Sequence, residues 1–240
     1  SMTNNLIIWW SSWVFHRIEP KRNTDEVIKK YFVDEDISAI EIMFNWWKIS
    51  ECSISRETLE NSFSHCSIHA PMYAYQGDEE SHKILKYLEK LCSELPIKNI
   101  VFHPNPVLDW IFFANYKHLP LSIENMDDRK TSFRWVEDIK KILDEYPYFN
   151  FTLDLQHCFV NDPTMQLAKD FHEAFWDRLV EYHISWSHPD YLHHPLYLTK
   201  QDQIIQALEN PNLPIIIESG FDEKDWLEKE IQYIYNLINF

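Results

Sequence analysis

The stretch SHKILKYLEKLCSELPIKNIVFH, residues 81–103, contains a helix pattern followed by a strand pattern. In residues 81–95 the apolar side chains recur three or four positions apart, which is typical of one face of an amphipathic helix. Residues 100–103 form an apolar run that is too short for a helix of normal length and that ends in His103. The stretch therefore predicts a helix that leads into a buried strand.

The same unit recurs along the whole chain. Seven more short runs, rich in Ile, Val and aromatic residues, follow at intervals of roughly 20 to 35 residues, the length of one strand-plus-helix unit. They are Leu6–Trp10, Ala39–Phe44, Cys66–His69, Leu121–Glu124, Phe151–Leu155, Val180–Ser185 and Ile215–Glu218. Eight strands alternating with helices predict an α/β protein, a (β/α)8 TIM barrel that forms a single domain over residues 1–240. An open doubly wound sheet is the alternative, but it needs fewer strands.

Two further features of the sequence bear on the predicted fold. Residues 104–120 leave room only for a short helix between the fourth and fifth strands. Ser1 precedes Met2, and we interpret it as a cloning remnant that carries no information about the fold.

Composition excludes several classes of protein. The hydrophobic content of 45% can supply one sizeable core, and the formal net charge of -16 disfavours a nucleic-acid partner while leaving it open. Gly77 and Gly220 are the only glycines, so a phosphate-binding loop built on spaced glycines is excluded. Four cysteines without a C-x-x-C pair, no secretion signal and no apolar run of about 18 residues indicate a cytoplasmic protein with reduced thiols and no membrane partner. The oligomeric state stays open.

Histidines and carboxylates stand at the ends of successive strands. These residues are His69, His103, Glu124, Asp154, His183 and Glu218, with Asn125 and His157 directly beyond two of the strands. Because the carboxyl ends of barrel strands meet at one mouth, we expect these side chains to converge there. Imidazole and carboxylate groups are ligands of zinc, manganese and related ions, so the series predicts a metal-dependent enzyme.

The ordered series of motifs resembles the xylose isomerase-like barrel superfamily. That superfamily includes endonuclease IV, of AP endonuclease family 2, and many sugar or sugar-phosphate isomerases and epimerases. The motifs are Ser67-Ile-His69, Phe102-His-Pro104, Ser122-Ile-Glu-Asn125, Leu153-Asp-Leu-Gln-His157, Tyr182-His-Ile184 and Ile216-Ile-Glu-Ser219. The resemblance extends from residue 69 to residue 218 and implies a metal-binding TIM barrel.

Resemblance to endonuclease IV implies up to three ions. The first would be held by His69, His103 and Glu124, the second by Glu124, Asp154, His183 and Glu218, and the third by His157 and His193. This sequence departs from the family at the third site, where Tyr191 stands in place of an acidic residue. Resemblance to the isomerases implies one ion, held by the second set alone. In that case Glu124 and Glu218 would also take and return a proton, and His157 would contact the substrate.

We therefore expect one to three divalent ions. Zinc is favoured if the three-histidine arrangement is occupied, and manganese, magnesium or cobalt if only the carboxylate-rich site is. The expected substrate contacts are His157, Trp186, His188, His194, Asn125 and Trp10. Trp186 and His188 stand where sugar isomerases often carry an arginine.

The acidic composition and the aromatic side chains near the mouth favour a small carbohydrate-like substrate. We predict isomerisation or epimerisation of a small sugar, sugar phosphate or related hydroxy-carbonyl, by proton transfer through glutamates. The alternative is metal-assisted phosphoester hydrolysis like that of endonuclease IV, which the histidine pair His69 and His103 favours. A lesser alternative is a metal-binding barrel without catalytic activity.

Overall fold

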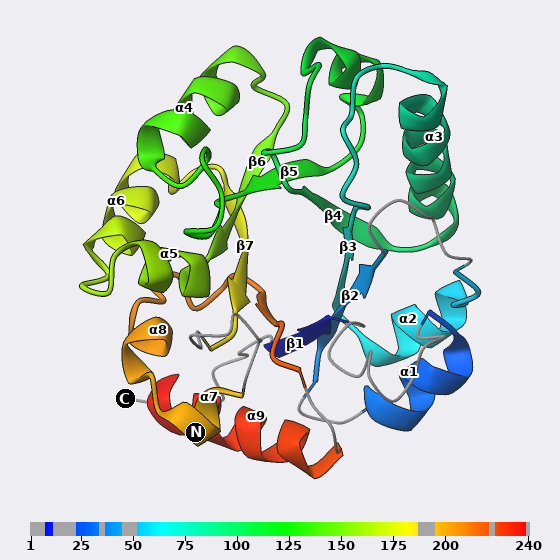
Figure 1. Ribbon diagram of the computed structural model, residues 1–240. Helices are drawn as coiled ribbons and strands as arrows, with labels where there is room; N and C mark the ends of the chain where they lie inside the picture. The colour runs from blue at the N-terminus through cyan, green and yellow to red at the C-terminus, as the bar shows by residue number, and fades with distance from the viewer. Residues whose placement is uncertain are drawn as a thin grey trace.

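The computed structural model describes residues 8–11, 23–33, 37–44, 52–186, 195–220 and 224–238. Within these residues eight parallel strands close into a barrel in chain order, and the last strand pairs with the first (Figure 1). The strands are β1 (Ile8–Ser11), β2 (Ala39–Met43), β3 (His65–His69), β4 (Ile97–Phe102), β5 (Leu121–Glu124), β6 (Asn150–Asp154), β7 (Leu179–Ile184) and β8 (Ile215–Ile217). The predicted (β/α)8 TIM barrel is therefore confirmed, and closure rules out the open doubly wound sheet.

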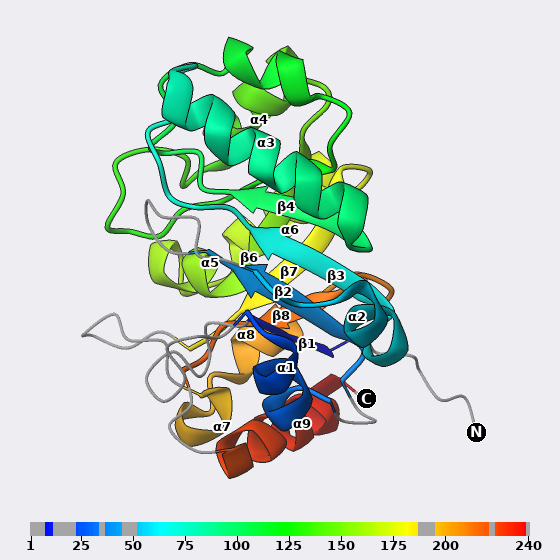
Figure 2. The same ribbon diagram turned by 90° about the vertical axis from the view of Figure 1, so that its right-hand side faces the viewer.

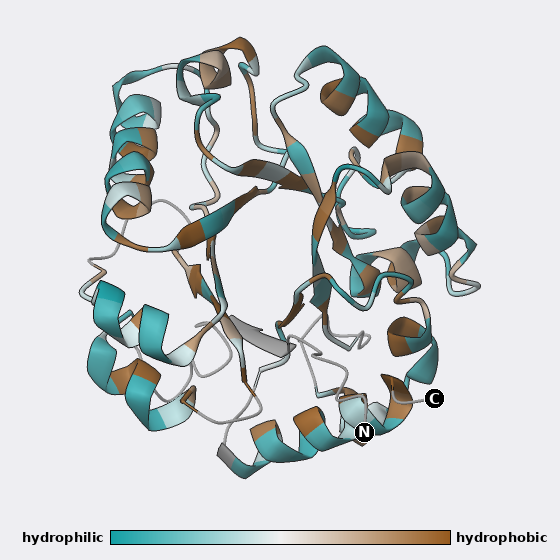
Figure 3. Ribbon diagram, turned by 180° about the vertical axis from the view of Figure 1, so that it is seen from behind, coloured by the Kyte–Doolittle hydropathy of each residue, from teal (hydrophilic) through white to brown (hydrophobic). Residues whose placement is uncertain are grey.

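Helices surround the barrel on its outside (Figures 1 and 2). They are α1 (Asp25–Tyr31), α2 (Arg56–Ser62), α3 (Glu79–Glu94), the 3-10 helix η1 (Ile111–Tyr116), α4 (Val136–Glu145), α5 (Leu155–Asn161), α6 (Gln166–Phe175), α7 (Leu196–Thr199), α8 (Asp202–Gln206) and α9 (Lys224–Ile238). Their outer faces are largely hydrophilic, whereas apolar residues concentrate on the strands and on the helix faces that cover them (Figure 3). Among the described residues, no helix combines the length and apolarity that a membrane crossing requires.

Helix α3 shows how local sequence sets an element. Its N-cap residue Asp78 accepts a hydrogen bond from the backbone N–H of Ser81 at 2.8 Å, and two glutamates occupy the first turn. The apolar residues that predicted the helix are buried against the strands, Leu85 and Leu88 completely. Strand β4 then begins at Ile97, three residues before the predicted start. Lys98 and Asn99 interrupt the apolar run, although the backbone there already pairs with β3.

The connection between β4 and β5 contains only the short helix η1, as predicted. Aromatic side chains fill the space that a longer helix would occupy. The ring of Phe113 lies 5.2 Å from that of Phe102 and 5.3 Å from that of Phe149, both in edge-to-face contact. Phe113 is fully buried, so the aromatic cluster closes this side of the barrel.

The inside of the barrel is unusually polar. Barrel interiors are ordinarily layers of branched apolar side chains. Here the alternate residues that share the inward positions of the strands include buried Glu41, Ser67, Asn99, Ser122, Thr152 and Glu181. The hydroxyl groups of Ser122 and Thr152 lie 2.8 Å apart, and the amide of Asn99 donates to Thr152 at 3.3 Å. This polar column leads to the carboxyl ends of the strands, which all lie at one end of the barrel (Figure 2).

Candidate metal centre

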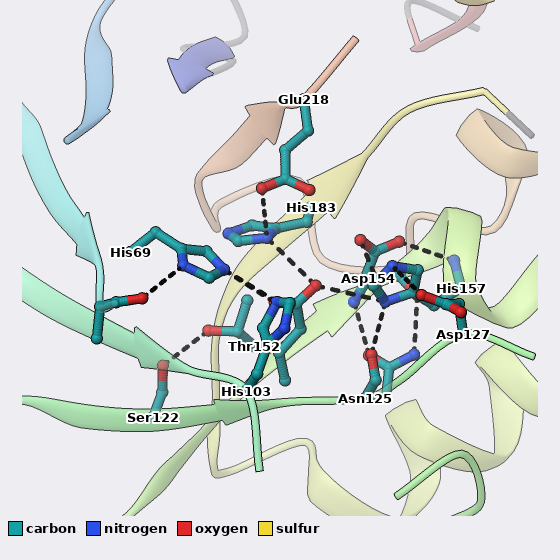
Figure 4. Close-up of polar contacts among 12 residues, drawn as sticks. His69, His103, Ser122, Asn125, Asp127, Thr152, Asp154, His157, His183 and Glu218 are labelled. Atoms are coloured by element: carbon teal, nitrogen blue, oxygen red, sulfur yellow. Dashed lines mark hydrogen bonds and ion pairs between the residues drawn. The ribbon is translucent and has the colours of Figure 1, made fainter. Parts of the chain in front are cut away.

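The predicted strand-end residues meet at the carboxyl end of the barrel (Figure 4). His69 is the last residue of β3, Glu124 of β5 and Asp154 of β6, while His183 lies within β7. His103 and Glu218 directly follow β4 and β8. Strand alternation points all of these side chains inward, because each lies an even number of positions after an inward-facing residue of its own strand. All but His103 are buried, so the cluster is largely withdrawn from solvent.

The first group of potential ligands consists of His69, His103 and Glu124. Nε2 of His103 lies 3.1 Å from Oε2 of Glu124 and 3.1 Å from Nε2 of His69, and the third separation, His69 to Glu124, is 3.5 Å. Ligand atoms around one tetrahedral zinc lie about 3.3 Å apart, given bonds of about 2.0–2.1 Å. The three atoms are therefore spaced like neighbours in one coordination shell. Nδ1 of His69 donates to the carbonyl of Ala70 at 3.1 Å, which leaves the lone pair on Nε2.

The second group consists of Glu124, Asp154, His183 and Glu218, whose ligand atoms all lie within 4.8 Å of one another. Nδ1 of His183 lies 3.4 Å from Oε1 of Glu218 and 3.6 Å from Oε1 of Glu124. Glu124 thus offers Oε2 to the first group and Oε1 to the second. This arrangement allows one carboxylate to bridge two ions.

His183 is held from below by two further carboxylates, which the sequence analysis did not identify. Its Nε2 lies 3.0 Å from Oε1 of Glu181 and 3.0 Å from Oε2 of Glu41, and both glutamates are fully buried. An N–H on Nε2 that donates to these carboxylates leaves the lone pair of Nδ1 directed at the second group. The only sequence signal was that both glutamates occupy inward positions of otherwise apolar strands.

His157 lies beside the second group. Its backbone N–H donates to Asp154 at 2.8 Å, its Nδ1 donates to the carbonyl of Asn125 at 2.7 Å, and its Nε2 lies 3.7 Å from Oδ2 of Asp127. Asp127 is buried and was also missed by the sequence analysis. The side chain of Asn125 pairs with the backbone of Asp154, accepting at 2.7 Å and donating at 3.0 Å. Asn125 is fully buried, so it braces β5 against β6.

The unpaired ligand atoms and the closely spaced carboxylates of the cluster are suited to bind a cation. Both carboxylate oxygens of Glu124, Oδ2 of Asp154 and Nδ1 of His183 are buried without a hydrogen-bond partner among the described residues. Burial raises the pKa of Asp154 and of Glu218. Burial also acts to raise the pKa of Glu124, but His103 and His183 lower it by more. Three carboxylates this close repel one another, and a divalent ion would remove that repulsion.

Several predicted residues fall outside this description. His188, His193 and His194 lie outside the described residues, as does the side chain of Trp10, whose backbone belongs to β1. The third predicted ion site therefore has only His157 placed. Trp186 follows β7 and packs, partly buried, against the core.

No family model matches the sequence, and no curated protein matches it. Solved structures nevertheless share its fold over nearly the whole chain. Endonuclease IV from Thermus thermophilus has a TM-score of 0.70 at 14% identity, covering 97% of this chain and 99% of that chain. A probable 3-DHS dehydratase from Bacillus anthracis has a TM-score of 0.65 at 13% identity, with coverage of 96% and 99%.

A sugar phosphate isomerase/epimerase from Parabacteroides distasonis has a TM-score of 0.61 at 12% identity, with coverage of 94% and 96%. These likenesses show that the chain shares its barrel fold with an endonuclease IV and with a sugar phosphate isomerase/epimerase, the two kinds of protein that the sequence motifs resemble. The three proteins have different activities by name, and one fold hosts many reactions, so the likeness shows the fold alone.

Proposed function

We propose that this protein is a divalent-metal-dependent enzyme that isomerises or epimerises a small sugar, sugar phosphate or related hydroxy-carbonyl. The observation that carries the proposal is the second group, in which two glutamates from different strands face one imidazole nitrogen. Oε1 of Glu218 and Oε1 of Glu124 lie 3.4 and 3.6 Å from Nδ1 of His183. A substrate carbon between these two carboxylates would have a proton acceptor and a proton donor within reach.

The two glutamates are suited to different protonation states. Burial raises the pKa of Glu218, whereas His103 and His183 outweigh burial and lower the pKa of Glu124. Environments that push two carboxyl pKa values apart are typical of acid–base pairs. In the metal-free site Glu218 is therefore the carboxyl group that takes up a proton more readily, and a bound divalent ion would lower the pKa of both groups.

Glu124, Asp154, His183 and Glu218 would hold the ion, and His69 and His103 would complete a second site through Glu124. When bound, the ion would polarise the substrate carbonyl and stabilise the negative charge that develops on its oxygen. Asn125 keeps Asp154 in place, and Glu41 and Glu181 keep Nδ1 of His183 facing the ion. Zinc suits the histidine-containing first group, and manganese, magnesium or cobalt suits the carboxylate-rich second group.

A small substrate agrees better with the charge of the chain than a polynucleotide does. Proteins that track a phosphate backbone neutralise several phosphates with clustered Lys and Arg. Here 38 acidic residues outnumber 22 basic ones. The proposed substrate is therefore a small molecule.

Proton exchange into the substrate tests this proposal. The metal-loaded protein is incubated in deuterated water with a panel of aldoses, ketoses and their phosphates, and deuterium at the carbon next to the carbonyl is measured. Glu124→Gln and Glu218→Gln should each lower the exchange rate at least about a hundredfold, the usual contribution of a general acid or base. Glu173→Gln, an exposed change on α6, serves as the control. Exchange that continues unaltered in both active-site variants would overturn the mechanism.

Metal-assisted phosphoester hydrolysis is the second candidate, and the first group favours it. An isomerase that uses one ion has no need of His69 and His103, whereas two ions that share a carboxylate can clamp a phosphate during in-line displacement. Elemental analysis of the purified protein, combined with an assay for nicking of abasic DNA, separates the two candidates. Two or three zincs per chain together with metal-dependent nicking would establish hydrolysis, and one manganese or magnesium without nicking would exclude it.

A further inference from the structure

Among the described connections at the carboxyl end of the barrel, positive charge is concentrated on one segment. Residues 125–135, between β5 and α4, contain Arg129, Lys130 and Arg134. The described connections after β3 (70–78) and β4 (103–110) contain neither Lys nor Arg, whereas Arg17, Lys21, Arg22 and Lys48, which follow β1 and β2 in the sequence, lie outside the described residues. In a chain of net charge -16, this segment is therefore the one, within the part of the chain that the structure describes, that can present a cation beside the second group.

Arg129 is fixed in place by Asp127. Its Nε donates to Oδ1 at 2.9 Å and its Nη2 donates to Oδ2 at 2.8 Å, which is the paired geometry of a strong guanidinium–carboxylate contact. The backbone N–H of Arg129 also donates to Oδ1, at 2.8 Å. The Asp127 side chain is only 6% exposed, whereas that of Arg129 is 44% exposed. The ion pair thus fixes the position of the Arg129 guanidinium and leaves much of the Arg129 side chain in contact with solvent.

The same carboxylate connects Arg129 to the metal centre. Oδ2 of Asp127 lies 3.7 Å from Nε2 of His157, and Figure 4 shows these two side chains beside Asp154. Nδ1 of His157 in turn lies 3.4 Å from Oε1 of Glu124 and 3.5 Å from Oδ2 of Asp154. Arg129 is therefore linked to the second group through Asp127 and His157.

We propose that Arg129, positioned by Asp127, binds a phosphate group on the substrate. A guanidinium matches phosphate oxygens in a two-point contact and keeps its charge at any working pH. Lys130, the next residue in the sequence, adds a second positive charge to the same segment. The inference rests on the proposed function, because it places the phosphate on the small substrate of that reaction. It narrows the substrate class to phosphorylated sugars.

Binding of inorganic phosphate tests the subsite without any turnover. Isothermal titration of the metal-loaded full chain, at constant ionic strength, compares the wild type with Arg129→Gln, Arg129→Lys and Lys141→Gln. Phosphate held by the ions contributes equally to all four proteins, so differences between them report on the side chains. Lys141 is exposed on α4 and is the matched control for loss of one charge. Arg129→Gln should weaken phosphate binding at least tenfold, Arg129→Lys less than that, and Lys141→Gln should leave it unchanged.

Phosphate binding that is the same in Arg129→Gln and in the wild type would overturn the inference. Should Arg129→Gln fail to fold, Arg129→Lys keeps the charge but loses the fork, and unchanged binding in that variant overturns it equally. Once a substrate is found, Arg129→Gln should raise KM about tenfold for the phosphorylated sugar only, with little change in kcat. Because the titration needs no reaction, a failed deuterium-exchange test would remove the proposed isomerisation and leave the phosphate site standing, and the reverse also holds.

Discussion

The carboxylates beneath His183 provide a direct test of the metal centre. Glu181 and Glu41 each lie 3.0 Å from Nε2 of His183, at full burial. Glu181→Gln keeps the size of the side chain but removes the negative charge that stabilises the N–H of the imidazole. Loss of such an outer partner typically lowers metal affinity 10- to 100-fold.

The structure indicates where the single and the double variant should fall within this 10- to 100-fold loss of metal affinity. Because Glu41 stays at the same distance after Glu181→Gln, the single change should weaken binding about tenfold, or about 1.4 kcal/mol. The double variant Glu41→Gln/Glu181→Gln removes both carboxyl groups and should approach a hundredfold loss. The effect should be confined to the ion of the second group, because His183 belongs to that group and not to the first.

Competition titration against a fluorescent chelator measures the affinity of each bound ion. Glu173→Gln is the control, and circular dichroism checks that every variant is folded. Affinities that stay unchanged in the double variant would show that Nδ1 of His183 does not hold an ion. Equal weakening of both ions would contradict the separation of the two groups.

Three further predictions follow from the same structure. His103→Ala should remove one ion per chain and Glu124→Gln should weaken both, by elemental analysis; identical results for the two variants would contradict a shared Glu124. Chelation should lower Tm by about 5 to 10 °C for a site saturated about a hundredfold over its Kd, and an unchanged Tm would argue against metal binding. Glu230, buried on α9, accepts hydrogen bonds from the backbone of Leu196 and Tyr197, and burial raises its pKa from 4.5 to about 7. The folded state therefore keeps a proton that the unfolded state loses, so the free energy of unfolding should fall by roughly 3 kcal/mol between pH 4.5 and 7.

Glu230→Gln should flatten that pH dependence, because the amide cannot ionise. Exposed Glu228→Gln on the same helix is the matched control and should retain the dependence of the wild type. Denaturant unfolding at several pH values measures both. A Glu230→Gln protein with the same pH profile as the wild type would contradict the assigned cause.

Much of the barrel could be predicted because its signals are local. Each strand is a short apolar run and each long helix shows the three-to-four spacing, so residues 81–103 alone predict α3 and β4, although β4 begins three residues earlier than predicted. The strand-end residues could also be predicted to meet, because a closed parallel barrel brings the carboxyl ends of all its strands to one mouth. This inference required only the predicted fold class, and it correctly grouped His69, Glu124 and Glu218 in one cluster.

The groups that support the cluster depend on contacts between distant segments. A glutamate inside an apolar strand shows no partner in the sequence, and only closure of the barrel brings Glu41 and Glu181 to the same imidazole nitrogen. The two-point contact of Asp127 with Arg129 is local, but its position beside His157 depends on hydrogen bonds from His157 and Asn161 of α5 to the backbone carbonyls of Asn125 and Met126. The sequence by itself thus determined the alternation of elements and the residues at the strand ends, because both depend on short-range periodicity. The tertiary structure alone decided which lone pairs face one another and which carboxyl groups burial perturbs, because distances between strands and exclusion of water arise only when the barrel closes.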